Sequence, residues 1–488
     1  MPGRIIVVGL GPGDPGLITR QAWEALCTAS CLFLRTRRHP SVDALPAGQT
    51  GIDFDAVYDR SPDFDTVYQT ITDRLIAEAR QGIDVVYAVP GDPSFGEASV
   101  QRLRPQAAAA AIELQVIPGV SFVEPSLALM EIDALDGLFI SDALELAAAH
   151  HPPFPPDRPA LIGQLYSQLV ASDVKLTLMN QYPETHSVQL IHDAGLDSGR
   201  IEHLPLHAID HSPALGLRSS LYVPPLPMGS SLEAFQEMVA HLRAPEGCPW
   251  DREQTYQSLR PHVLEEAYEV LQALDSDDMP ALREELGDLL LQIVLQAQIA
   301  TEGGEFSLAD VLSGIHAKIL RRHPHVFGGV AVEGVDQVLQ NWETLKAAER
   351  EEQGEGKGLL DGVPGVLPAL AQAHELQGRA RRVGFDWPNL AGVEAKLAEE
   401  LNEVLRASGE AEKAAEVGDM LFAAVNYARW LDVEPEVALR EANLRFRRRF
   451  GAMERAAAAQ GRSLNALTAL EWDRLWEEAK AGEQGGSG

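Results

Sequence analysis

Glu265-Glu266-Ala267-Tyr268-Glu269 precedes Glu285-Leu286-Gly287-Asp288 in this chain of 488 residues, and the same spacing of acidic residues occurs a second time. The second copy reads Glu399-Glu400-Leu401-Asn402-Glu403, followed by Glu416-Val417-Gly418-Asp419. Residues three apart share one face of an α-helix, so each copy predicts a pair of helices with acidic faces. Apolar neighbours such as Leu289-Leu290 put those acids beside the core-facing side of each helix. The repeat therefore predicts two similar all-helical segments.

Antiparallel packing of the two helices in each copy would bring four carboxylates to one point. Such a cluster repels itself, and burying part of it is costly unless a cation compensates. A hard divalent cation with oxygen ligands does so, and Mg²⁺ usually keeps waters that a phosphate can displace. One acidic cluster alone is more often a solvated helix face. The apolar neighbours and the repetition favour a metal site here.

Both helical segments resemble the MazG family of all-α nucleoside triphosphate pyrophosphohydrolases. The family pattern, E-E-x-x-E and then E-x-x-D after a variable spacer, fits both copies. Gly247-Cys248-Pro249-Trp250-Asp251, Arg321–Phe327 and Gly384-Phe385-Asp386-Trp387 are also similar to the family. The resemblance implies Mg²⁺-dependent cleavage between the α- and β-phosphates, which yields a nucleoside monophosphate and pyrophosphate.

By position, the same resemblance implies metal ligands at Glu266, Glu269, Glu285 and Asp288, and at Glu400, Glu403, Glu416 and Asp419 in the second copy. Glu265 and Glu399 would support these ligands or act as bases for the attacking water. Mg²⁺ in such a site activates water and neutralises charge on the leaving pyrophosphate.

A triphosphate beside four carboxylates also needs positive charge, and each copy closes with a basic cluster. The candidate phosphate-binding residues are Lys318, Arg322, Arg445 and Arg449, with solvated helix ends as the alternative. Trp250 and Trp387 are candidates for stacking a nucleobase, and an anchoring role at a helix start is the alternative for both.

The first half of the chain alternates short β-branched runs with helical stretches, which predicts an α/β architecture with much parallel pairing. The expected strands are Ile5–Val8, Asp84–Ala88, Leu114–Ile117, Ala160–Gly163, Lys175–Met179 and Leu221–Val223. Gly-rich loops follow three of them, at the strand ends where open α/β sheets bind ligands. In the first loop, Asp14 stands where a dinucleotide fingerprint that starts at Gly9 has its third glycine, and no phosphate-binding P-loop motif occurs in the sequence.

Those three loops together resemble the tetrapyrrole (class III) methylase family, which binds S-adenosylmethionine between two α/β subdomains. The resemblance implies cofactor contacts at Gly9, Gly11, Gly13, Gly91, Asp92, Pro93, Pro118 and Gly119. Tyr87-Ala88-Val89-Pro90 replaces the R-L-K-G of the porphyrinogen methylases, which argues against a tetrapyrrole substrate. Retention of the fold as a docking or oligomerising module is the alternative to an active methylase.

The predicted fold class is therefore multidomain, with an N-terminal α/β methylase-like domain of two subdomains and C-terminal all-α MazG-like repeats. The expected segments are residues 1–224 for the α/β domain, 225–231 for a Pro/Gly/Ser-rich linker, 232–352 and 363–480 for the two repeats, 353–362 for a second linker and 481–488 for a flexible tail.

Forty Lys and Arg against 72 Asp and Glu give a formal net charge of −32, which argues against nucleic acid or an anionic membrane as a partner. Three cysteines are too few for a disulfide framework. Met1–Arg4 runs directly into the first strand, so we expect no signal peptide and a cytoplasmic protein. The MazG resemblance and the amphipathic helices together predict a homodimer, and the resemblance implies that its substrates are nucleoside triphosphates. The alternative functions are S-adenosylmethionine-dependent methyl transfer with a regulatory helical region, and a dimerisation scaffold with structural metal.

Overall fold

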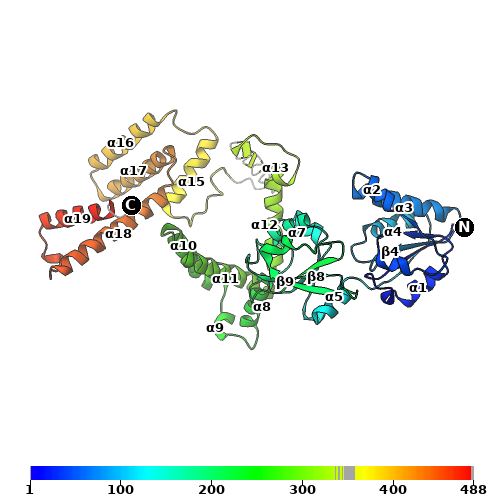
Figure 1. The fold of residues 1–488 in the computed structure, drawn as a ribbon. Helices are drawn as coiled ribbons and strands as arrows, with labels where there is room; N and C mark the ends of the chain where they lie inside the picture. Colours follow the sequence, from blue (N-terminus) through cyan, green and yellow to red (C-terminus); the bar gives the residue numbers. More distant parts are fainter. Residues whose placement is uncertain (1, 336, 339–340, 343–344, 346–357, 485–488) are drawn as a thin grey trace. The chain divides into compact units, whose positions relative to one another are not determined.

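The computed structural model describes residues 2–335, 337–338, 341–342, 345 and 358–484. The chain divides into two compact units, Met1–Gln254 and Thr255–Gly488. The first unit is α/β and the second is helical in its described residues (Figure 1), which confirms the predicted fold class. Among the described residues, no helix combines the length and the apolar character that crossing a bilayer requires.

The first sheet of the α/β unit is parallel, with strand order β3-β2-β4-β1-β5. Its strands are β1 (Ile5–Gly9), β2 (Leu32–Leu34), β3 (Ile52–Asp53), β4 (Val85–Val89) and β5 (Leu114–Ile117). All five residues of β1 and of β4 are buried, because helices cover both faces of a central parallel strand. The predicted runs at Ile5–Val8, Asp84–Ala88 and Leu114–Ile117 are thus confirmed as neighbouring strands.

Helices on either side of this sheet form two apolar layers. The helices of the first subdomain are α1 (Arg20–Cys27), α2 (Asp55–Arg60), α3 (Phe64–Arg80) and α4 (Ala98–Ala109). Ile71 and Leu103, from α3 and α4, pack on the face that carries Val7, whereas Leu26 from α1 packs on the opposite face.

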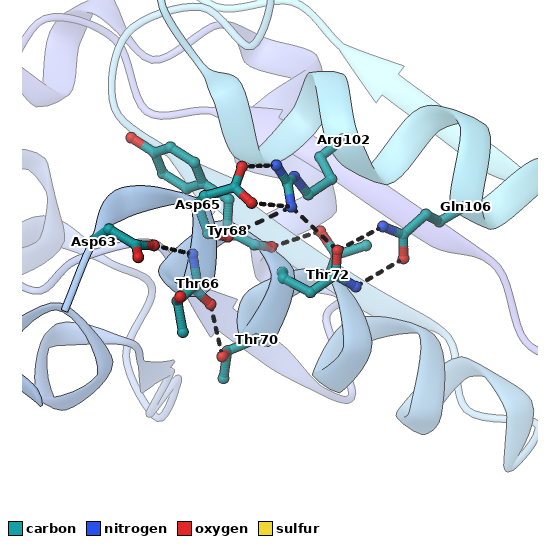
Figure 2. Close-up of polar contacts among 9 residues, drawn as sticks. Asp63, Asp65, Thr66, Tyr68, Thr70, Thr72, Arg102 and Gln106 are labelled. Atoms are coloured by element: carbon teal, nitrogen blue, oxygen red, sulfur yellow. Dashed lines mark hydrogen bonds and ion pairs between the residues drawn. The ribbon is translucent and has the colours of Figure 1, made fainter. Parts of the chain in front are cut away.

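Polar contacts fix the start of α3 and join it to α4 (Figure 2). The Asp63 side chain accepts a hydrogen bond from the backbone N–H of Thr66 at 2.7 Å and so caps the helix. Arg102 forms an ion pair with Asp65. The Nε2 of Gln106 donates to Gln69 Oε1 at 3.1 Å. Phe64 and Tyr68 of α3 line the cavity described below.

The second sheet is mixed, with strand order β6-β7-β10-β8-β9. Its strands are β6 (Phe139–Asp142), β7 (Ala160–Gly163), β8 (Ser187–His192), β9 (Arg200–Pro205) and β10 (Ser219–Val223). The remaining helices of the unit are α5 (Val123–Met130), α6 (Ala143–Ala148), α7 (Gln168–Leu178), α8 (Leu232–Arg243) and α9 (Pro249–Arg252). The two sheets correspond to the two predicted α/β subdomains.

The prediction of a strand at Lys175–Met179 is wrong, because these residues form the end of α7 and its C-cap. Ser167 caps the helix by accepting from the backbone N–H of Val170. Val170, Val174 and Leu178 recur at a spacing of four residues and are buried against the second sheet. The short apolar run was ambiguous by itself, and the longer helical period decides the structure.

The helical unit contains two tightly packed pairs of consecutive helices. Its helices are α10 (Tyr256–Asp275), α11 (Met279–Gly303), α12 (Leu308–Arg322), α13 (Pro324–Phe327), α15 (Ala369–Arg382), α16 (Leu390–Arg406), α17 (Glu410–Trp430), α18 (Pro435–Ala459) and α19 (Ala469–Gln484). Three-residue turns join α10 to α11 and α16 to α17, and each pair packs along its length. The predicted helical stretches Ala281–Ile299 and Glu394–Leu405 are confirmed within α11 and α16.

Residues 225–231, the predicted linker, lack helix and strand and lie within the first compact unit, before α8. Of the second predicted linker, residues 353–357 lie outside the described residues. The last helix continues to Gln484, so it extends four residues into the segment expected as a tail, and residues 485–488 lie outside the described part.

Candidate active sites

The first acidic site is built from α10 and α11. The Thr255 side chain accepts from the backbone N–H of Ser258, and this capping box fixes the start of α10. One side-chain oxygen from each of Glu266, Glu285 and Asp288 lies within 4.8 Å of the others. A single cation placed among them can therefore contact all three carboxylates.

The electrostatics of this site favour a cation. Burial raises the pKa of Glu266, and the nearby carboxylates of Asp288 and Glu269 raise it further. Burial followed by the charge of Glu269 also raises the pKa of Glu285. A raised carboxyl pKa means that the surroundings oppose the negative charge, and a bound divalent cation would reverse that balance.

The second acidic site repeats the arrangement on α16 and α17. The carboxylates of Glu400, Glu416 and Asp419 offer oxygens within 4.8 Å of one another. Glu400 is only 6% exposed, and its buried Oε2 has no hydrogen-bond partner. Burial, followed by the charges of Glu400 and Glu416, raises the pKa of Glu403. An unpartnered carboxylate oxygen beside two further carboxylates fits a hard cation.

The structure thus brings three of the four predicted ligands of each copy within 4.8 Å of one another. Glu269 lies on α10, where its charge adds to burial and to Asp288 in raising the pKa of Glu266. Glu403 lies on α16, where burial and the charges of Glu400 and Glu416 raise its own pKa. The predicted bases lie farther out. The Glu265 side chain is 63% exposed and 3.7 Å from His262, and the Glu399 side chain is 56% exposed and 3.2 Å from Lys396.

The predicted cofactor loops of the α/β unit meet at the carboxyl ends of three neighbouring strands. Gly9 ends β1, Gly91 follows β4 and Gly119 follows β5. A Cβ on Gly9 would lie 2.4 Å from the carbonyl oxygen of Gly91 and 2.7 Å from the Cα of Gly119. Gly9 and Gly119 are therefore required for the close approach of the loops to one another.

The other members of this set have distinct positions. Asp92 is buried and accepts a hydrogen bond from the backbone N–H of Gly119 at 2.8 Å, which ties two of the loops together. Gly11 pairs with Gly91 through backbone hydrogen bonds. Gly13 has a φ of 139°. Gly91 has a φ of 64° and would place a Cβ in open space. Pro93 and Pro118 flank the second and third loops.

A cavity of about 480 Å³ lies beside these loops and is lined by residues of both subdomains. Gly91 and Asp92 reach it from the first subdomain, and Tyr166 and Ser219 reach it from the second. The cavity is also lined by basic residues that the sequence analysis missed. Those basic lining residues are Arg35, Arg38, His39 and Arg218.

A buried polar network contacts Arg35, one of these lining residues. The Glu97 carboxylate lies 3.2 Å from Nη1 of Arg35 and accepts from the Ser99 hydroxyl at 2.7 Å. Arg35 also donates from Nε to the Tyr58 hydroxyl at 3.0 Å. Burial raises the pKa of Glu97 despite the charge of Arg35. These contacts fix the Arg35 side chain in the cavity wall.

Comparison with known proteins agrees with both halves of this description. Residues 4–210 match the tetrapyrrole (corrin/porphyrin) methylases, and residues 254–327 match the MazG nucleotide pyrophosphohydrolase domain. The protein YabN of Bacillus subtilis is 40% identical over 99% of this chain and 100% of its own length. This chain belongs to the YabN family.

The helical half of this YabN-family chain has relatives of its own. The nucleoside triphosphate pyrophosphohydrolase/pyrophosphatase MazG of Thermotoga maritima is 42% identical over 51% of this chain and 97% of its own length. The nucleoside triphosphate pyrophosphohydrolase of Escherichia coli K12 is 41% identical over 52% of this chain and 98% of its own length.

The predicted phosphate-binding bases of this family member lie on two helices. Lys318 and Arg322 are on α12, the helix that follows α11. Arg445 and Arg449 are on α18, where Arg445 lies 3.5 Å from Glu441 and Arg449 lies over the ring of Trp476.

The two predicted base-stacking tryptophans differ in their surroundings. Trp250 is on α9, in the first unit, and is 58% exposed. The Trp387 ring lies against Gly392 in the first turn of α16, the contact expected of an anchor at a helix start. Next to it, the Asp386 carboxylate accepts hydrogen bonds from Arg429 at 2.7 Å and from Trp430 at 3.1 Å. Burial alone would raise the pKa of Asp386, but these hydrogen bonds outweigh it and lower the pKa.

Sequence analysis also missed Lys396, a cation that contacts the second acidic site. Its Nζ lies 2.7 Å from Oε1 of Glu400. The available signal was a lysine four residues before a glutamate on a predicted helix.

Proposed function

We propose that this chain is a Mg²⁺-dependent nucleoside triphosphate pyrophosphohydrolase, which converts a nucleoside triphosphate and water to a nucleoside monophosphate and pyrophosphate. The observation that carries the proposal is the pair of acidic sites on α10–α11 and α16–α17, each with three carboxylates within 4.8 Å. Its MazG relatives support the same activity. Such a reaction suits the sanitising of nucleotide pools.

In this proposal the residues within each site have separate roles. Glu266, Glu285 and Asp288 hold the cation in the first copy, with Glu269 beside them, and Glu400, Glu416 and Asp419 do so in the second, with Glu403 beside them. Bound Mg²⁺ supplies the charge that the triphosphate needs and lowers the pKa of water. Glu265 and Glu399 lie at the exposed edge of each site, where a carboxylate can orient the attacking water and take its proton. The residues proposed to bind phosphate are Lys318, Arg322, Arg445 and Arg449. Trp250 and Trp387 are proposed to stack on the nucleobase.

The test is incubation of the full chain with a panel of nucleoside triphosphates, with Mg²⁺ and with a chelator, and identification of the products by mass. We expect pyrophosphate and the nucleoside monophosphate with Mg²⁺ only. Release of orthophosphate alone would contradict the proposal. Glu266→Gln and Glu400→Gln each lower the rate if both copies are active. Full activity after either change assigns catalysis to the other copy.

The α/β unit supports a second function, binding of S-adenosylmethionine for methyl transfer. The supporting observation is that Gly91 leaves open space beside the cavity, where a Cβ would intrude. Calorimetric titration of the full chain with S-adenosylmethionine tests this function. Saturable heat that Gly91→Val removes supports it, and absence of heat argues for a docking role instead.

We further propose that the protein is a cytoplasmic homodimer whose substrates are nucleoside triphosphates rather than nucleic acid, and that it does not bind membranes. The charge of −32 supports the exclusion of polyanionic partners. Exposed apolar residues on the acidic helices support self-association. These include Leu286 and Leu290 on α11 and Leu421 on α17.

A further inference from the structure

The two acidic sites differ at one position that lies next to the carboxylates. Three residues before the Glu-Glu pair, the first copy has His262 and the second has Lys396. Lys396 lies 2.7 Å from Glu400 and 3.2 Å from Glu399, whereas His262 lies 3.7 Å from Glu265. The two copies therefore differ in geometry, because the ammonium of Lys396 lies on a carboxylate of the acidic group itself, whereas the imidazole of His262 lies beside Glu265.

Lys396 binds only one side of the Glu400 carboxylate. Its ammonium lies 2.7 Å from Oε1, while Oε2 is buried without a hydrogen-bond partner, and the Glu400 carboxylate also belongs to the group that includes Glu416 and Asp419. Lys396 and a divalent cation can therefore share this carboxylate, one on each oxygen. The cation must then bind beside a fixed positive charge.

That charge changes the electrostatic balance between the copies. Five acids recur at equivalent positions of the two copies, and the first copy adds Glu284 beside Glu285. The equivalent acids are Glu265, Glu266, Glu269, Glu285 and Asp288 in the first copy, and Glu399, Glu400, Glu403, Glu416 and Asp419 in the second. In the second copy the Lys396 ammonium offsets one of these negative charges. The same ammonium also holds Glu400 in place when no cation is bound. Repulsion of the cation and preorganisation of its ligand thus have opposite effects on affinity.

We propose that Lys396 makes the second copy the weaker divalent-cation site, so that the two copies are loaded at different concentrations of free Mg²⁺. The inference rests on the proposed pyrophosphohydrolase function of both sites. Repulsion outweighs preorganisation because a single turn of helix separates Lys396 from Glu400, and the ammonium stays within a few ångströms of the bound cation. Over such distances a full charge in a partly buried site is only weakly screened.

The test measures metal binding directly, with Mn²⁺ as the probe and the free-ion EPR signal as the readout. In the full chain, Glu400→Gln disables the second site, so that binding to the first is measured alone. Glu266→Gln disables the first site and leaves the second. We expect the first site to bind Mn²⁺ about tenfold more tightly, the order expected when one unit charge lies a few ångströms from the cation and preorganisation of Glu400 offsets part of the repulsion. Lys396→Met in the Glu266→Gln chain should close this gap, and Lys396→Arg, which keeps the charge, should preserve it.

Lys480→Met is the matched control, because Lys480 pairs with Glu477 on α19 and leaves the acidic sites unchanged. If Lys396→Met impairs folding, the reciprocal change His262→Lys in the Glu400→Gln chain should loosen the first site about tenfold. His316→Lys, on the exposed face of α12, controls for an added lysine in the first copy.

Equal Mn²⁺ affinity at the two sites, or weaker binding after Lys396→Met, would overturn the inference while leaving the proposed function intact. Failure of both isolated sites to bind Mn²⁺, together with absence of pyrophosphate release, would instead overturn the proposed function. The two failures are therefore distinguishable in one set of proteins.

Discussion

Gly9 lies where the first strand of the α/β unit passes into its ligand-facing loop, and two other loops lie against it. A Cβ at this position would be 2.4 Å from the carbonyl oxygen of Gly91, well inside van der Waals contact with backbone that no rotamer change can move. We expect Gly9→Ala to lower the free energy of unfolding of this unit by about 1–3 kcal/mol, the usual cost of overpacking. Scanning calorimetry of the full chain measures the change.

Gly216→Ala is the control, because a Cβ there meets open space and the backbone φ is ordinary. We expect its effect to stay within about 0.5 kcal/mol. An equal loss of stability in both variants would show that the contact between the Gly9 and Gly91 loops does not explain the effect.

We expect the free energy of unfolding to depend on pH because of His39, which lines the cavity. Burial, followed by the charges of Arg218 and Arg35, lowers the pKa of His39 from 6.5 to about 4. The unfolded chain therefore takes up this proton at higher pH than the folded chain. The contribution of neutral His39 is complete above pH 6.5 and is lost as the pH falls toward 4, by at most about 3 kcal/mol and by less to the extent that solvent reaches the ring.

Denaturant unfolding of the full chain over this pH range measures the effect. His39→Gln cannot be protonated, so its unfolding free energy should fall less steeply with decreasing pH than that of the unaltered chain. Parallel pH profiles for the two proteins would show that His39 remains accessible to protons in the folded state.

At the scale of helices and strands, the spacing of the acidic residues was enough to predict which carboxylates share a helix face. The spacing of Glu266 and Glu269, and of Glu285 and Asp288, placed each pair on one helix face, and the structure confirms both helices. The spacing could not show which carboxylate loses its hydrogen-bond partner, because the burial of Glu400 depends on how α16 and α17 pack. The same limit applies to Lys175–Met179, where a short apolar run fits a strand and a helix equally well.

Residues that meet across long stretches of sequence were beyond prediction. His39 and Arg218 line one cavity although they belong to different subdomains, and only the tertiary fold brings them together. The basic cluster makes Arg449 a candidate for phosphate binding, but its position over the ring of Trp476 on the next helix could not be read from that cluster. Charge alone identified candidates, whereas the side-chain directions came from packing.

At the scale of the whole molecule, the acidic helices expose more apolar surface than an isolated unit would be expected to carry. Leu286, Leu290 and Ile293 on α11 are 49%, 40% and 46% exposed and lie on adjoining turns. Val417 and Leu421 hold the equivalent positions of the first two on α17, at 38% and 49%. Contiguous apolar patches of this kind on folded proteins usually mark interaction surfaces.

We therefore expect a molar mass of twice that of the chain in light scattering after size exclusion, and conversion to monomer by the double change Leu290→Glu and Leu421→Glu. Burying a new carboxylate in an apolar interface is costly enough to dissociate it. Leu169→Glu is the control, since Leu169 is 74% exposed on α7 and lies far from the acidic helices in sequence. A monomeric mass for the unaltered protein at micromolar concentration would contradict the dimer. It would leave these helix faces for another part of the same chain to cover.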